Sequence, residues 1–233
     1  MPSPNQLILG TWQFETIDEQ TAAALVAQAH DTGIRTFDTA AVYACGNAER
    51  ILGKHLHTSD TIITKTTAVR KGIPSIATAY PKQYIEESVA GSVERLGRMP
   101  DVMLMHNWDE AWEADPDTPA TIDKFRTICT QQGIPLIGIS LPNGYSGSLE
   151  AHANILDAVD CLEAPYNQDS PSLSAQRLST LSSTMPVLVR SIFRHGRDTE
   201  KITSRLQEAV AISGLVVVGA TKPEQIQQWS TVL

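Results

Sequence analysis

Residues 34–66 of the chain read IRTFDTAAVYACGNAERILGKHLHTSDTIITKT and contain one complete strand–helix–strand unit. The apolar run Ile34–Ala40 predicts a buried strand, the amphipathic stretch Ala48–His55 predicts a helix, and Thr61–Thr66 predicts the next strand. Parallel strands need a long crossover connection, usually a helix, whereas a tight hairpin joins antiparallel strands. The predicted helix between these two strands therefore indicates that they lie parallel. Such a unit is typical of α/β proteins.

The same alternation extends along the rest of the chain. Eight runs rich in Val, Ile and Leu are predicted to be strands: Leu7–Trp12, Ile34–Ala40, Thr61–Thr66, Asp101–Asn107, Leu136–Leu141, Ala158–Tyr166, Val187–Phe193 and Leu215–Ala220. Eight segments have helical periodicity: Thr21–Asp31, Ala48–His55, Tyr84–Leu96, Thr121–Gln132, Leu149–Leu156, Ala175–Leu181, Glu200–Ile212 and Pro223–Val232.

Eight strands, each followed by a helix, predict a closed (β/α)8 TIM barrel, because crossover helices and right-handed connections bring such units round on themselves. A barrel usually takes about 250 residues, so a chain of 233 residues predicts a compact one. The alternative, an open doubly wound sheet, would carry a glycine-rich phosphate loop after its first strand. The sequence has no G-x-G-x-x-G there and no linker that divides it, so residues 1–233 are predicted to form a single domain.

Composition and charge exclude several classes of protein. The chain is 42% hydrophobic, which is too apolar for a disordered chain, and 26 acidic against 18 basic residues give a net charge of −8. It therefore lacks the basic surface that nucleic acid requires. No apolar stretch is long enough to cross a membrane, and the first residues do not resemble a signal peptide. We expect a cytoplasmic monomer or small homo-oligomer with no nucleic-acid or membrane partner.

No metal site is predicted from the sequence. The cysteines are few, far apart and not in a C-x-x-C pair, so they indicate neither a disulfide framework nor a zinc site: Cys45, Cys129 and Cys161. The acidic run at 109–117 lacks the ligand spacing of a calcium loop. Four histidines lie on predicted helices or at their ends, where surface roles are expected: His30, His55, His57 and His152.

Ionisable side chains occur at the carboxyl ends of three consecutive predicted strands. Asp38 ends the second strand, Lys65 the third and His106 the fourth, and Tyr43 lies in the loop after the second. In a barrel these strand ends form the face that carries the active site. An ammonium group beside a phenol lowers the phenol pKa, and Asp38 would keep Lys65 charged. With His106 hydrogen-bonded to a carbonyl oxygen, the pattern predicts that Tyr43 protonates that oxygen.

At these residues the sequence resembles the aldo-keto reductases. Matching segments occur in order along the chain: Leu9–Trp12, Gly33–Tyr43, Gly46–Gly53, Ile63–Lys65, Leu104–His106, Ile137–Ser140, Pro165–Asn167, Arg190–Phe193 and Val218–Gln225. The resemblance implies a (β/α)8 barrel and an NADPH-dependent oxidoreductase that reduces a small-molecule carbonyl. It implies a catalytic tetrad of Asp38, Tyr43, Lys65 and His106, with Tyr43 as the general acid.

The resemblance also implies where the cofactor binds. The positions that match the family's NADPH contacts are Thr11, Trp12, Ser140, Glu163, Ser191, Gly219, Ala220, Thr221, Lys222 and Gln225. Three aromatic residues follow strands at the same end of the predicted barrel and are expected to wall the substrate pocket: Trp12, Trp108 and Tyr145.

Several positions depart from the residues usual in that family. Leu141 and Glu163 stand where Asn and Gln usually bind the nicotinamide carboxamide, and Gln225 and Trp229 replace usual contacts to the 2′-phosphate and adenine. The chain also ends at Leu233, directly after the last predicted helix, where the family generally continues into a tail. These differences favour a second hypothesis, a redox-neutral isomerase, dehydratase or cyclase that uses the same tetrad. A third, a non-catalytic regulatory subunit, is disfavoured by the intact tetrad.

Overall fold

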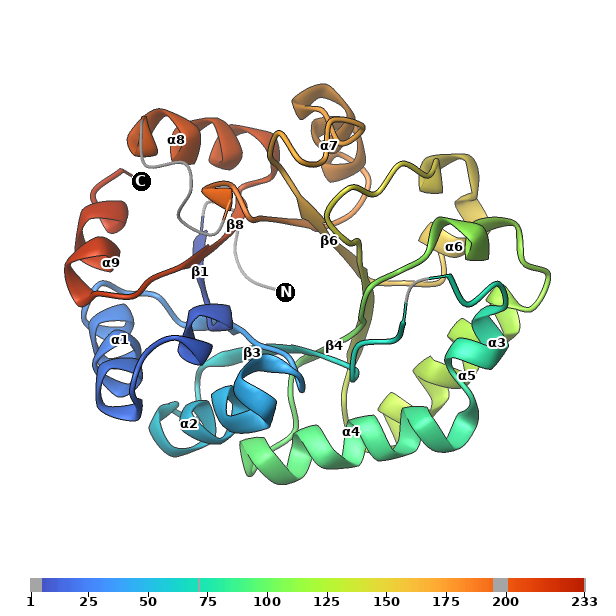
Figure 1. The fold of residues 1–233 in the computed structure, drawn as a ribbon, viewed down its shortest axis with the longest axis horizontal. Coiled ribbons are helices and arrows are strands. Elements are labelled where there is room, and N and C mark those ends of the chain that lie inside the picture. Colours follow the sequence, from blue (N-terminus) through green and yellow to red (C-terminus); the bar gives the residue numbers. More distant parts are fainter. Residues whose placement is uncertain (1–5, 71, 195–200, 233) are drawn as a thin grey trace.

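The computed structural model describes residues 6–70, 72–194 and 201–232 (Figure 1). Eight parallel strands pair in chain order and the last pairs with the first, so the sheet closes into a barrel. The strands are β1 (Gln6–Gly10), β2 (Thr36–Asp38), β3 (Thr61–Lys65), β4 (Val102–Met105), β5 (Leu136–Ser140), β6 (Cys161–Pro165), β7 (Val187–Arg190) and β8 (Leu215–Gly219). The predicted (β/α)8 fold is confirmed, and every predicted strand overlaps an observed one.

Helices surround the barrel on its outside (Figure 1). They are α1 (Glu19–Asp31), α2 (Asn47–His55), α3 (Ile76–Ala79), α4 (Lys82–Leu96), α5 (Thr118–Gln131), α6 (Ala153–Leu156), α7 (Ala175–Ser182), α8 (Ile202–Ser213) and α9 (Pro223–Ser230). The short helix α3 was not predicted. The helix predicted at Leu149–Leu156 is a 3-10 turn followed by α6. The helix predicted at Glu200–Ile212 corresponds to α8, and its first predicted residue, Glu200, lies outside the described residues.

Local chemistry sets the ends of these helices. The carboxylate of Asp18 accepts a hydrogen bond from the backbone N–H of Thr21 at 2.7 Å and so caps the first turn of α1. Gly33 and Gly97 follow α1 and α4 with φ of +86° and +67°, a left-handed conformation that a side chain would disfavour. Both helices therefore end where a glycine permits this turn of the backbone.

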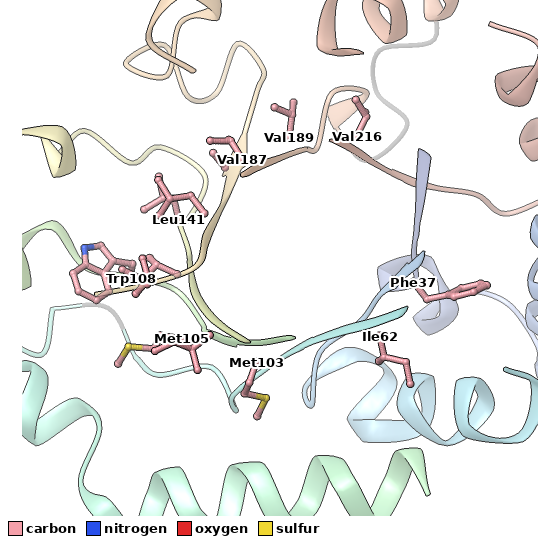
Figure 2. Close-up of a cluster of buried hydrophobic side chains, with 14 of the residues drawn as sticks. Phe37, Ile62, Met103, Met105, Trp108, Leu141, Val187, Val189 and Val216 are labelled. Atoms are coloured by element: carbon pink, nitrogen blue, oxygen red, sulfur yellow. The ribbon is translucent and has the colours of Figure 1, made fainter. Parts of the chain in front are cut away.

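The core has two parts on either side of the barrel wall. Side chains inside the barrel form one buried cluster: Ile8, Ile63, Val102, Leu104, Cys161, Leu188, Leu215 and Val217. The larger cluster fills the space between strands and helices, where Figure 2 shows Met103 and Phe37 pointing outward from their strands. Apolar packing on both faces explains why the strands are nearly continuous hydrophobic runs. It also leaves the carboxyl ends of the strands as the place for polar groups.

Among the helices that the structure describes, none combines the length and the apolar character needed to span a membrane.

Candidate functional site

Four predicted residues meet at the carboxyl ends of β2, β3 and β4. Asp38 and Lys65 are the last residues of β2 and β3, and His106 directly follows β4. Tyr43 begins a short 3-10 turn, Tyr43–Gly46, in the loop after β2. Because β2, β3 and β4 are neighbouring parallel strands, their ends meet at one edge and bring the four side chains together.

The Lys65 ammonium group lies at the centre of this site and is fully buried. It donates hydrogen bonds to a carboxylate oxygen of Asp38 at 2.6 Å and to the backbone carbonyl of Thr39 at 3.0 Å. Burial alone would lower the pKa of Lys65, but the carboxylates of Asp38 and Glu163 outweigh burial and raise that pKa. The prediction that Asp38 keeps Lys65 charged therefore agrees with the geometry.

A second carboxylate, Glu163 on β6, approaches the same ammonium group. Its Oε2 lies 3.1 Å from Lys65 Nζ, and its Oε1 lies 2.6 Å from Nε of Arg190 on β7. Burial favours the neutral acid, but the two cations lower the pKa of Glu163 below its usual value. The same carboxylate, together with burial as the larger cause, raises the pKa of Asp38. Two carboxylates thus share one buried ammonium.

Arg190 is a site residue that the sequence analysis did not identify as one. Besides its ion pair with Glu163, it donates to the hydroxyl of Ser191 at 2.9 Å and to the backbone carbonyl of Leu141. The signal was present in the sequence, because a cation at the end of an otherwise apolar strand requires a buried or cavity-facing partner.

Tyr43 is partly buried and faces both Lys65 and His106. Lys65 Nζ lies 5.3 Å from the centre of its ring, and the His106 ring lies edge-on at 6.3 Å between ring centres. Burial raises the pKa of Tyr43, Lys65 opposes the rise, and the carboxylates of Asp38 and Glu163 reinforce it. The expectation of a lowered phenol pKa is therefore wrong in its net direction. Tyr43 is a neutral phenol at neutral pH, which is the form that can donate a proton.

His106 is held as a neutral imidazole. Burial, and then the positive charges of Lys65 and Arg190, lower its pKa to about 3. Its backbone is fixed from both sides, since its N–H donates to the Thr66 hydroxyl and its carbonyl accepts from the Tyr80 hydroxyl. The ring atom Nδ1 is buried and has no hydrogen-bond partner among the described residues. A neutral imidazole can bind a polar substrate atom through a ring nitrogen that faces a cavity.

A cavity of about 530 Å³ opens above these residues. Asp38, Tyr43 and His106 form part of its wall. The loops after β4 and β5 contribute Asn107 and Asn143 to its lining. The cavity extends across the ends of β7 and β8 to α9, where its lining includes Arg190, Ser191, Phe193, Gly219, Thr221, Gln225 and Trp229. Its volume lies within the range of about 300 to 1,000 Å³ usual for small-molecule and cofactor sites.

Five of the predicted cofactor positions line this cavity: Trp12, Ser191, Gly219, Thr221 and Gln225. The side-chain amide of Gln13 lies over Gly219, so a Cβ at that position would require the flexible Gln13 side chain to move. The side chain of Gln225 already has partners within the fold, because its oxygen accepts hydrogen bonds from the backbone N–H groups of Thr221 at 2.8 Å and Lys222 at 3.1 Å. These bonds cap α9.

The other predicted cofactor positions are not in the lining of the cavity: Thr11, Ser140, Glu163, Ala220 and Lys222. The Thr11 hydroxyl donates to the backbone carbonyl of Asp38 at 3.1 Å, and the Ser140 hydroxyl donates to Glu163 at 3.2 Å. Ala220 is buried and Lys222 is exposed at the start of α9. These side chains support the site or lie beside it.

Two of the three predicted pocket aromatics do not reach the cavity. Trp108 is fully buried and packs edge-to-face against Trp112 at 5.6 Å between ring centres. Tyr145 is also buried, and its hydroxyl donates to the carboxylate of Glu113. The direction of a loop side chain depends on the helices packed beneath it, and here both rings turn into the core. Trp12 alone of the three lines the cavity, joined by Phe193.

The aldo/keto reductase family model matches residues 6–164 of the chain. Versiconal hemiacetal acetate reductase from Aspergillus parasiticus is 31% identical over 120 residues, which cover 42% of this chain and 35% of that protein. A putative voltage-gated potassium channel subunit beta from Schizosaccharomyces pombe is 33% identical over 108 residues, which cover 42% of this chain and 31% of that protein. The chain thus spans about a third of the length of these curated relatives.

Solved structures share the fold over nearly the whole chain. The crystal structure of an aldo-keto reductase from Klebsiella pneumoniae in complex with NADPH superposes with a TM-score of 0.76 at 17% identity. The superposition covers 97% of this chain and 84% of that one. At 17% sequence identity this comparison shows a shared fold alone.

Proposed function

The chain belongs to the aldo/keto reductase family, and we propose that it is an oxidoreductase that uses NADPH to reduce a carbonyl group of a small molecule. The observation that supports this best is the position of Tyr43 and His106 in the wall of one cavity, with the Lys65 ammonium buried beside them. A proton donor, a neutral hydrogen-bonding ring and a fixed positive charge are the groups that protonation of a carbonyl oxygen requires.

The cavity contains groups that fit a nicotinamide dinucleotide. Arg190 and Asn143 are polar groups close to the tetrad, where a carboxamide or a phosphate would need donors. At the other end Phe193 and Trp229 pack together at 5.6 Å between ring centres and both line the cavity, so they would offer an aromatic surface to an adenine ring. When bound, NADPH would supply the hydride that reduces the carbonyl carbon.

The chain's own contribution is the proton. The Tyr43 hydroxyl would donate its proton to the substrate oxygen, which becomes the hydroxyl oxygen of the alcohol. The phenolate left behind would be stabilised by the Lys65 ammonium, whose Nζ lies 5.3 Å from the Tyr43 ring centre. Asp38 holds that ammonium in place through the 2.6 Å hydrogen bond.

His106 would orient the carbonyl group before the proton moves. It is neutral because burial and the neighbouring cations lower its pKa to about 3, so it can donate one hydrogen bond without competing as an acid. A single donor held by the fixed backbone of His106 would place the substrate oxygen near the Tyr43 hydroxyl, and such positioning lowers the barrier by reducing the entropy lost on reaction.

The proposal is tested by incubating the purified chain with NADPH and a panel of small aliphatic and aromatic aldehydes and ketones. We expect at least one compound to be converted to its alcohol, with one NADPH oxidised for each alcohol formed, since the reaction couples the two. NADPH absorbance and product analysis measure both quantities. No alcohol from any member of the panel would contradict the proposal.

A second candidate function is redox-neutral proton transfer by the same tetrad. It is favoured by one observation: polar groups of β5, β6 and β7 bind one another, through Ser140, Glu163 and Arg190, and Leu141 is buried. An isomerisation or dehydration that proceeds without nicotinamide and is lost on Tyr43→Phe would favour this candidate over reduction.

Replacing Glu163 by Gln should move the pH dependence of carbonyl reduction. Because burial, Asp38 and Glu163 all raise the pKa of Tyr43, removing the Glu163 charge lowers that pKa. Reduction requires the protonated phenol, so the alkaline fall of kcat/KM should occur at lower pH in Glu163→Gln. A pH profile of kcat/KM measures this shift.

The matched control for this profile is Glu113→Gln. Glu113 is also a buried carboxylate, but it bonds to Tyr145 away from the cavity. In Glu113→Gln the alkaline fall of kcat/KM should occur at the same pH as in the unmodified chain. An unmoved limb in Glu163→Gln would show that Glu163 does not act on Tyr43.

A further inference from the structure

A cluster of potential metal ligands lies at the end of the barrel opposite the cavity. His30 is in the last turn of α1, and His57 and Asp60 are in the loop that leads from α2 into β3. One ring nitrogen of each histidine and one carboxylate oxygen of Asp60 lie within 4.8 Å of one another. We propose that these three residues bind a zinc ion, which stabilises the fold and takes no part in catalysis.

Burial holds the side chains of His30 and Asp60 in place, and the exposed ring of His57 rests on His30. The rings of His30 and His57 stack at 3.9 Å between centres with 14° between their planes, and the edge of the Phe37 side chain fixes His30 from another side at 5.4 Å. His30 Nε2 lies 2.8 Å from Oδ2 of Asp60. His57 is exposed, as predicted from the sequence, whereas the His30 side chain is only 10% exposed. Contrary to the sequence expectation, His30 is part of a packed polar cluster.

Asp60 provides the independent sign that an ion belongs here. Its Oδ2 is shared by His30 Nε2 and the backbone N–H of His57, at 2.8 and 2.7 Å. Its Oδ1 is buried and has no hydrogen-bond partner among the described residues. A buried carboxylate oxygen without a partner is unfavourable, and such an atom in a native structure calls for a water or an ion to explain it.

The ligand set favours zinc over calcium or magnesium. Imidazole nitrogens are borderline ligands, and Zn²⁺ binds them together with carboxylates, whereas Ca²⁺ and Mg²⁺ prefer oxygen ligands alone. Zinc–ligand distances of about 2.0–2.2 Å place donor atoms roughly 3.3 Å apart. His30 Nε2 and Asp60 Oδ2 now lie 2.8 Å apart and would separate to admit the ion. Because the two imidazole rings stack nearly parallel, the exposed ring of His57 would turn off His30 to aim a nitrogen at the ion. The exposed ring of His57 gives the ion a way in.

Arg98 holds the loop without occupying the ligand atoms. Its guanidinium group donates to the backbone carbonyls of His57 at 3.0 Å and Asp60 at 3.2 Å. The loop is therefore fixed through its backbone, and the ring of His57 and the free oxygen of Asp60 remain available to an ion.

The position of the site indicates a structural role. Asp60 precedes β3 and Lys65 ends it, so the two sites are separated by roughly 16 Å along the strand. Residues at the amino-terminal face of a barrel contribute to stability, and the opposite face carries the chemistry. An ion here would join α1 to the α2–β3 loop and stabilise the folded chain by its binding free energy.

The test uses the untagged chain, stripped with a chelator and titrated with ZnCl₂ by calorimetry. We expect one equivalent to bind with a Kd of about 1 µM or tighter, and the thermal midpoint to rise when zinc is added. Co²⁺ in place of Zn²⁺ should give the visible absorption bands of a nitrogen- and oxygen-bound cobalt ion. His57→Ala removes an exposed ring, so it should fold normally and lose at least about tenfold in affinity.

Two control variants separate this site from adventitious binding. His55→Ala removes an exposed histidine two residues away in the sequence, and Cys45→Ser removes an exposed thiol. Both should bind zinc as the unmodified chain does. Binding weaker than about 100 µM, retention of full affinity by His57→Ala, or equal loss in His55→Ala or Cys45→Ser would overturn the proposal.

Discussion

Tyr43→Phe is expected to lower kcat/KM for carbonyl reduction by about 10²- to 10⁴-fold, the contribution typical of a positioned general acid. The substitution removes only the phenol oxygen, so the ring keeps its edge-on contact with His106. The affinity for NADPH should therefore change little. Steady-state kinetics with the compound that the unmodified chain reduces fastest, together with a fluorescence titration of NADPH, measure the two quantities.

The control is Tyr166→Phe, which removes another tyrosine hydroxyl. Tyr166 bonds to Glu208 at 2.6 Å and does not belong to the lining of the catalytic cavity. It should retain normal kcat/KM. Equal rates in Tyr43→Phe and the unmodified chain would contradict the role given to Tyr43, and equal losses in both variants would point to a general effect of removing a tyrosine hydroxyl.

Lys65→Met is expected to remove activity and to destabilise the fold by about 3–5 kcal/mol, as breaking a buried ion pair does. Methionine has nearly the same length, but it leaves the buried carboxylates of Asp38 and Glu163 without their shared cation. One of them must then be protonated or exposed to water. Urea unfolding followed by circular dichroism measures the loss of stability.

Two further variants separate charge from packing at Lys65. Lys54→Met removes a lysine whose ion pair with Glu19 is exposed, and it should leave stability nearly unchanged. Lys65→Met combined with Asp38→Asn removes the carboxylate that Lys65 alone pairs with, whereas Glu163 keeps Arg190, so the double variant should recover part of the lost stability. If the double variant is as unstable as Lys65→Met, the pairing of the two carboxylates through Lys65 is not the cause of the loss.

The positions of the proposed catalytic residues could be predicted because they depend on strand ends. Asp38, Lys65 and His106 each lie at the end of an apolar run, and the barrel topology alone brings those ends together. Tyr43 lies five residues after Asp38 in a short loop, which limits how far its ring can be from the others. Local sequence, together with the rule that parallel strand ends meet at one face of a barrel, was therefore enough to predict that these four residues lie close together.

The ion pairs behind the tetrad could not be predicted in the same way. A glutamate within the buried strand β6 signals that a cation must lie nearby. The sequence has 18 lysines and arginines, and only the closed barrel selects Lys65 and Arg190 as its partners. The net pKa of Tyr43 depends on this arrangement, so its direction could not be inferred from the tetrad alone.

The burial of Trp108 and Tyr145 was unpredictable for a related reason. Both follow strands at the correct end of the barrel, but each ring is held by a contact across the fold, to Trp112 and to Glu113. Sequence position gives the end of the barrel on which a loop residue lies. It does not give the direction of the side chain, which depends on long-range packing.

The central claim, NADPH-dependent reduction of a carbonyl, is tested most directly by titrating the purified chain with NADPH. The cavity that joins the tetrad to Phe193 and Trp229 predicts saturable binding of one NADPH for each chain. Arg190→Met should weaken that binding, because Arg190 is the cation in the cavity wall next to the tetrad. Saturation at one equivalent is the result we expect, and no binding at millimolar NADPH would contradict hydride transfer by this protein.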